Sequence, residues 1–206
     1  MMSTKSAVAV LVNTIVEMAE QQTNPVLAVI GEAVVQFREQ QKYPQPPLDF
    51  QQGPWRAFYH CHAVPDSDLQ EHGHFHIFTR YHDEWVHVVA LSMDADGQPQ
   101  AWVTVNRWVT DGPWLSATQL KEHLASARYP QQGLSLLESW LLAMLQVFTV
   151  EVSDLLETRD QVLQSRITDI AKQPPQDDRN IYTLAIQKID LLTKLKNLNY
   201  HNQAGE

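Results

Sequence analysis

Residues 73–109 read GHFHIFTRYHDEWVHVVALSMDADGQPQAWVTVNRWV. β-Branched and aromatic residues dominate this stretch, and the turn-forming segments 81–84 and 94–97 interrupt it. Strands joined by such short loops pair with their chain neighbours in an antiparallel meander. With a similar segment upstream, the sequence predicts four strands, over residues 55–63, 73–81, 85–93 and 99–109.

Helical spacing of apolar residues flanks these strands. We expect helices over residues 4–21, over 25 to about 41, and over 134–148, the last apolar nearly all round and therefore buried. The proline-rich segment 43–47 cannot continue a helix and is expected to be extended. Residues 116–119 form a Ser-x-x-Gln capping box, which predicts another helix start.

The C-terminal part carries two more apolar stripes at helical spacing, over 151–171 and 177–198, separated by Pro174-Pro175. They predict an αα-hairpin. The expected fold is therefore α+β: an antiparallel sheet of about four strands between N-terminal and C-terminal helices. We expect residues 1–150 to form the core domain with the histidine-rich sheet. Residues 151–206 would be a helical hairpin that packs on this core, on a second copy of the chain or on a protein partner.

Composition narrows the class of protein. The chain has 206 residues, a formal net charge of −9 and no run of lysine or arginine, which argues against nucleic acid and anionic membranes as partners. No apolar stretch approaches the roughly 20 residues that a membrane span needs. Cys61 is the single cysteine, so no internal disulfide framework forms, and we expect a cytoplasmic protein.

Histidines gather at one place in the sequence. Residues 60–62 read HCH and residues 72–76 read HGHFH, so this short region holds five of the nine histidines. In a strand, alternate residues point to the same face, and neighbouring strands lie about 4.8 Å apart. Imidazole is a common ligand of zinc, iron and manganese, so the pattern predicts a divalent-metal site. The expected ligands are His60, His62, His74 and His76.

Further side chains suggest catalysis or substrate binding near such a site. Glu71 directly precedes the second histidine motif and His72 is the first residue of that motif; both are candidate catalytic groups. Arg107, a third candidate, could clamp a carboxylate or phosphate, with Asn106 and Trp108 as further substrate contacts. The alternative for Arg107 is a structural ion pair with an acidic residue.

The sequence leaves open which face of the sheet carries His87, a histidine of the third expected strand. His87 shares a strand face with Val89, Leu91 and Met93. Whether that face is the one with the other histidines depends on strand register, which the sequence does not fix.

Two short resemblances to enzyme families involve the same histidines. Residues 72–78, HGHFHIF, resemble the motif of histidine-triad nucleotide hydrolases and transferases, which implies that His74 attacks an α-phosphate. The usual upstream Asn-x-Gly and Gln elements are not seen. His60-Cys61-His62 with Gly53 is distantly similar to the first cupin motif, which implies a metal site in a barrel of about eight strands.

A longer resemblance covers residues 55–114. The segments 71–76 (EHGHFH), 87–94 (HVVALSMD) and 104–110 (TVNRWVT) resemble an uncharacterised bacterial family of unknown function. The resemblance implies that this block is one unit, and it brings no activity.

The histidine pattern favours a divalent-metal-binding protein that could act as a metalloenzyme on a small molecule. One alternative is a helical interaction or assembly protein with structural histidines. Another is a nucleotide hydrolase of the histidine-triad type. Whether the chain is an enzyme is not decided by its sequence.

Overall fold

In the residues that the structure describes, six strands form one antiparallel sheet, and their order in the sheet follows their order in the chain. The structure is a computed structural model that describes residues 4–31, 41–61, 71–130, 132–167 and 174–203. The strands are β1 (Tyr43–Asp49), β2 (Trp55–His60), β3 (Gly73–Tyr81), β4 (Glu84–Met93), β5 (Pro99–Val105) and β6 (Thr183–Lys188). The α+β class and the antiparallel pairing are confirmed.

The described part also contains seven α-helices and two short 3₁₀ helices. The α-helices are α1 (Thr4–Glu20), α2 (Pro25–Ile30), α3 (Arg107–Thr110), α4 (Ala117–Ser126), α5 (Leu136–Val147), α6 (Thr149–Ser165) and α7 (Leu191–Gln203). The 3₁₀ helices are η2 (Phe50–Gln52) and η3 (Pro175–Asp177). The helix expected over 25 to about 41 begins at Pro25 as predicted, but α2 ends at Ile30. Residues 32–40 lie outside the described residues.

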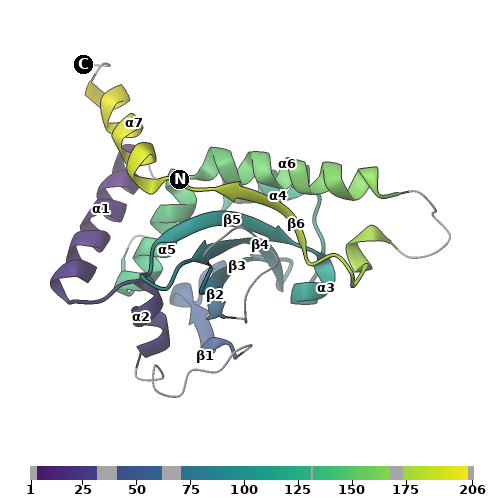
Figure 1. Cartoon of the computed structure of the whole chain (residues 1–206), viewed down its shortest axis with the longest axis horizontal. Coiled ribbons are helices and arrows are strands. Elements are labelled where there is room, and N and C mark those ends of the chain that lie inside the picture. The colour runs from purple at the N-terminus through teal and green to yellow at the C-terminus, as the bar shows by residue number, and fades with distance from the viewer. Residues whose placement is uncertain (1–3, 32–40, 62–70, 131, 168–173, 204–206) are drawn as a thin grey trace.

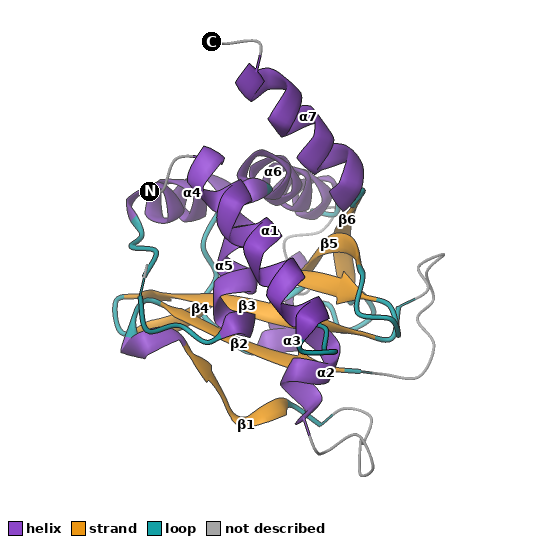
Figure 2. Cartoon of the chain, turned by 90° about the vertical axis from the view of Figure 1, so that its left-hand side faces the viewer, coloured by secondary structure: helices purple, strands orange, loops and turns teal. Residues whose placement is uncertain are grey.

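The main helical layer covers one face of the sheet. Figure 1 shows α4 and α6 over the strands, and Figure 2 shows α1, α4, α6 and α7 on one side of them with β1 on the other. Trp102 of β5 faces Phe148 at the junction of α5 and α6, and Phe75 of β3 faces Trp140 of α5. Helix α5 is buried along most of its length, which confirms the prediction of an apolar central helix.

The number of strands exceeds the expected four because both edges of the sheet carry one more. Strand β1 contains Pro44, Pro46 and Pro47, which lack the backbone N–H needed inside a sheet. An edge strand tolerates this loss, because only one side of it pairs. The segment expected to be extended is therefore a strand, paired antiparallel with β2.

The predicted C-terminal helical hairpin is wrong in its second half. Helix α6 is present, but residues 183–188, expected to be helical, form β6 along the open edge of β5. Its apolar residues Leu184 and Ala185 are buried there. The spacing of apolar residues suited a helix, but pairing with the free hydrogen-bonding groups of β5 decides the structure. Helicity returns only at α7.

Within the described residues, no single helix combines the length and apolarity needed to cross a bilayer. Helices α5 and α6 meet that requirement only as a pair, and they are bent by 71° at their junction.

An apolar groove of about 690 Å³ lies between α1, the start of α7 and the turn between β4 and β5. Val16 of α1 and Leu192 of α7 line it and are 50% and 68% exposed. Association with a second copy or a protein partner through the C-terminal helices stays a prediction, and this groove is where it would be sought.

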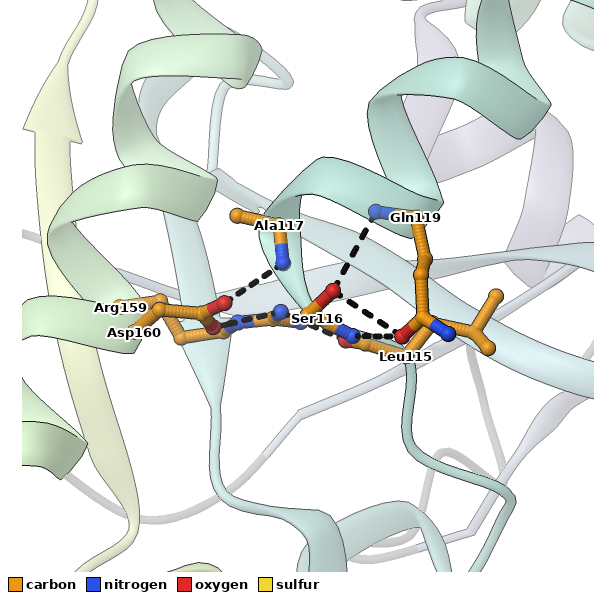
Figure 3. A network of polar contacts seen from close by, with 6 residues as sticks. All are labelled: Leu115, Ser116, Ala117, Gln119, Arg159 and Asp160. Carbon is orange, nitrogen blue, oxygen red and sulfur yellow. Dashed lines mark hydrogen bonds and ion pairs between the residues drawn. The ribbon is translucent and has the colours of Figure 1, made fainter.

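A buried arginine joins α6 to the start of α4, as Figure 3 shows. Arg159 is 3% exposed, and its Nη2 donates to the Leu115 carbonyl oxygen at 2.8 Å. Its Nε donates to Asp160, whose other carboxylate oxygen accepts from the Ala117 backbone N–H at 2.6 Å. The predicted capping box of α4, in which Ser116 takes part, is confirmed beside this network. Arg159 therefore places a positive charge inside the protein.

Candidate functional site

Three histidines meet on the sheet face that points away from the main helical layer. His60 lies directly opposite His74 in the β2–β3 register. His76 follows two residues later and projects from the same face, whereas Phe75 between them projects into the core. The potential ligand atoms of the three histidines lie within 4.8 Å of one another, and their ring centroids are 4.6 to 5.0 Å apart. We call His60, His74 and His76 the histidine group.

The structure thus brings together three of the four predicted ligands, His60, His74 and His76. The fourth, His62, lies outside the described residues, so its role stays a prediction. The histidine group owes its position to strand alternation and to the pairing of β2 with β3, as the sequence pattern indicated.

A chain of hydrogen bonds runs through the histidine group. It begins at Glu71, whose Oε1 lies 3.0 Å from Nδ1 of His74. Nε2 of His74 lies 3.0 Å from Nε2 of His76, and Nδ1 of His76 lies 3.0 Å from Nε2 of His87. Glu71 lies two residues before β3, and its side chain is only 6% exposed. The predicted catalytic residue Glu71 is therefore a hydrogen-bond partner of Nδ1 of His74, the ring nitrogen that does not contact His76.

His87 joins this chain through a β-bulge. Val89 pairs with Ile77, but the next pair joins His87 to Phe78, so Val88 is an extra residue of β4. Without it, His87 would point to the face of Val89, as strict alternation predicts. The bulge turns His87 to the face of the histidine group, which corrects the expected placement.

Burial keeps two of these imidazoles neutral. Burial, and then the neighbouring histidines, hold the pKa of His76 well below its usual range. Burial, and then Arg159 and His74, lower the pKa of His87 to about 3. Neutral imidazole is the form that binds metal ions, so at neutral pH no proton has to leave either ring first.

Gly73 permits the close approach of β2 and β3 beside the histidines. A Cβ atom at this position would lie 2.4 Å from the carbonyl oxygen of His60 and 2.7 Å from the Tyr59 hydroxyl. The same hydroxyl lies 2.7 Å from Nδ1 of His72, and the two rings stack. Strand alternation would place His72 on the face of His74, but His72 is instead a partner of the core residue Tyr59. Its predicted catalytic role stays a prediction.

The segment before β6 is bound by three consecutive side chains, those of Asn106, Arg107 and Trp108. The strand expected over 99–109 ends at Val105, because the Asn106 side chain caps α3. Its Nδ2 also donates to the carbonyl oxygens of Pro175 and Asp178, at 3.0 and 3.2 Å.

The two residues after Asn106 contact the same segment. Arg107 forms an ion pair with Asp177, and Trp108 Nε1 donates to the Ile181 carbonyl oxygen at 2.9 Å. The ion-pair alternative for Arg107 is therefore what the structure contains. The expected role of these residues in substrate binding stays a prediction.

Replacement of the buried Asn106 by alanine is expected to lower the free energy of unfolding by about 2 kcal/mol, because it removes a helix cap and leaves two partly buried carbonyls without this donor. Arg107→Ala should lower it by less than about 1 kcal/mol, because this ion pair is partly exposed. Urea unfolding of both variants measures the difference. Equal losses of unfolding free energy in the two variants would show that the Asn106 amide does not stabilise the segment before β6 as described.

Sequence reasoning missed a serine on the histidine face. Ser92 of β4 pairs with His74 and is fully buried. Among the residues that the structure describes, its hydroxyl has no hydrogen-bond partner. Ala90, Ala101 and Val103 continue this face as a small apolar cluster. The alternation that reveals the histidines also places Ser92 on their face, but only once the β3–β4 register is known.

The family model described as Domain of unknown function (DUF6969) matches residues 5–189. The chain belongs to this family. The match spans the whole sheet and the histidine group, and it ends before α7. The resemblance to an uncharacterised family is thereby confirmed, and the family supplies no activity. No curated protein and no solved structure matches the chain.

Proposed function

We propose that this protein binds a divalent metal ion through His60, His74 and His76, with zinc, iron or manganese as the candidate ions. The observation that carries the proposal is the convergence of three imidazoles on one sheet face. Two nitrogens that each lie roughly 2.0–2.1 Å from one tetrahedral ion are about 3.3 Å apart. The separation of 3.0 Å between the Nε2 atoms of His74 and His76 is close to that value.

The hydrogen-bond partner of the second ring nitrogen of His74 also fits a metal centre. Histidine ligands generally donate their second N–H to a carboxylate, carbonyl or water, which fixes the ring and the tautomer. Glu71 is placed to accept this bond from Nδ1 of His74. A buried carboxylate also offsets part of the charge of a divalent cation.

The Ser92 hydroxyl supports a ligand at this site. A buried hydroxyl without a partner costs about 1–3 kcal/mol. Since Ser92 lies on the histidine face next to His74, a water or small oxygen ligand above this part of the sheet would supply the missing bond. Three histidines leave at least one coordination position for such a ligand.

We propose in addition that the centre acts on a small molecule that approaches from the side of His60. His76 is 1% and His74 8% exposed, whereas His60 is only half-buried. A divalent ion would supply Lewis-acid or redox chemistry there. The histidine-triad alternative, in which Nε2 of His74 would attack a phosphate, stays a prediction.

Elemental analysis of the chain purified without chelator tests metal binding. We expect about one equivalent of a single divalent metal, and its loss in His74→Ala, because that variant removes the central ligand. His82→Asn is the matched control: His82 is exposed in the β3–β4 turn, where its positive φ suits asparagine. Absence of stoichiometric metal from the wild type, or its retention in His74→Ala, would exclude the proposed centre.

A further inference from the structure

His87 is held against the histidine group from two sides. Its Nε2 lies 3.0 Å from Nδ1 of His76, and its ring meets the Phe78 ring nearly at right angles, with centroids 5.2 Å apart. The β4 bulge is what brings it there. Bulges recur next to active sites, where they re-aim one side chain.

Without an ion, the chain of hydrogen bonds allows one arrangement of protons if each ring is neutral and Glu71 is ionised. His74 donates through Nδ1–H to Glu71, so its Nε2 is a bare acceptor. His76 must then donate through Nε2–H, which leaves its Nδ1 bare. His87 completes the chain by donating its own Nε2–H to that nitrogen.

With an ion, two of these three bonds have to change. Nε2 of His76 must be bare to bind, so the proton of His76 moves to Nδ1 and points at His87. His87 must then accept through Nε2 and keep its proton on Nδ1. The bond between His74 and Glu71 stays as it was, because Nδ1 of His74 is the donor in both states.

We propose that His87 is a positioning residue of the metal centre: it accepts the hydrogen bond from Nδ1–H of His76 and so fixes the tautomer in which His76 binds the ion. This inference rests on the proposed metal-binding function. An imidazole suits the position, because a neutral ring donates through one nitrogen and accepts through the other. Leucine has a similar bulk and can do neither, whereas glutamine carries both an acceptor and a donor at its end.

The test compares the full-length wild type with His87→Leu and His87→Gln. Competition with a chelator gives the Zn²⁺ affinity, the absorption spectrum of the Co²⁺ form reports ligand geometry, and nitrogen NMR of the Zn²⁺ form reports tautomers. We expect His87→Leu to bind Zn²⁺ about 10- to 100-fold more weakly with an altered Co²⁺ spectrum. His87→Gln should stay within about a factor of five of the wild type, because its amide restores the acceptor. His76 of the wild type should carry its proton on Nδ1 in the Zn²⁺ form and on Nε2 in the metal-free protein.

Three outcomes would overturn the inference. One is wild-type affinity and spectrum in His87→Leu, another is an equal loss in both variants, and the third is a proton on the same nitrogen of His76 in both states. If His87→Leu does not fold, His87→Gln and the wild-type NMR decide. A wild type that takes up neither Zn²⁺ nor Co²⁺ would overturn the proposed function itself, which is a different result from metal binding that ignores His87.

Discussion

Alanine at position 73 is expected to destabilise the protein by on the order of 3 kcal/mol or more, because the added methyl group has no space. Its Cβ would lie 2.4 Å from the His60 carbonyl oxygen and within 2.8 Å of two atoms of the Tyr59 ring and hydroxyl. A side chain can rotate away, but the carbonyl belongs to the backbone of β2. Relief therefore requires β2 to move relative to β3, which also displaces His60 from His74.

Urea unfolding and Zn²⁺ affinity of Gly73→Ala measure both consequences. Gly112→Ala is the graded comparison: its Cβ would lie 3.0 Å from the Trp85 carbonyl oxygen, a tight but milder backbone contact, so its loss of stability should be smaller. Adding Tyr59→Phe to Gly73→Ala should not restore stability, since the closest contact is with the backbone. A free energy of unfolding within about 1 kcal/mol of the wild type would refute this explanation, as would full rescue by Tyr59→Phe.

The histidine group could be predicted because it depends on two simple regularities. Alternation along a strand puts His74 and His76 on one face, and antiparallel pairing of consecutive strands brings His60 opposite. His87 could not be placed in this way. A bulge inserts one residue and inverts the alternation beyond it, and the β4 sequence around Val88 carries no glycine or proline to announce it.

The edges of the sheet were harder to predict than its centre. The apolar residues of 177–198 fit a helical stripe, and only the unpaired edge of β5 explains why residues 183–188 are extended. Asn106 shows a similar competition: a strand pattern runs through it, but its side chain caps α3 and binds two carbonyls from the segment before β6. In both cases a partner distant in sequence decides the local structure.

Removal of the metal is expected to lower the melting temperature by about 10 °C. A ligand that binds only the folded state at 1,000 times its Kd stabilises by about 4 kcal/mol. For a chain of this length, each kcal/mol shifts the melting temperature by roughly 2–4 °C. The chelator-treated protein should therefore melt well below the untreated protein, and Zn²⁺ should restore most of the loss.

For each variant, the informative quantity is the difference between its melting temperatures with and without chelator. His76→Ala removes a ligand that is 1% exposed, so it lowers the melting temperature by itself through the cavity that it leaves. Its melting temperature should nevertheless be the same with and without chelator, because no site remains. His82→Asn should keep the full wild-type difference, since its side chain lies in the β3–β4 turn. If His76→Ala still responds to chelator by about 10 °C, the stabilising ion binds elsewhere, because linkage requires the site to be lost with its ligand.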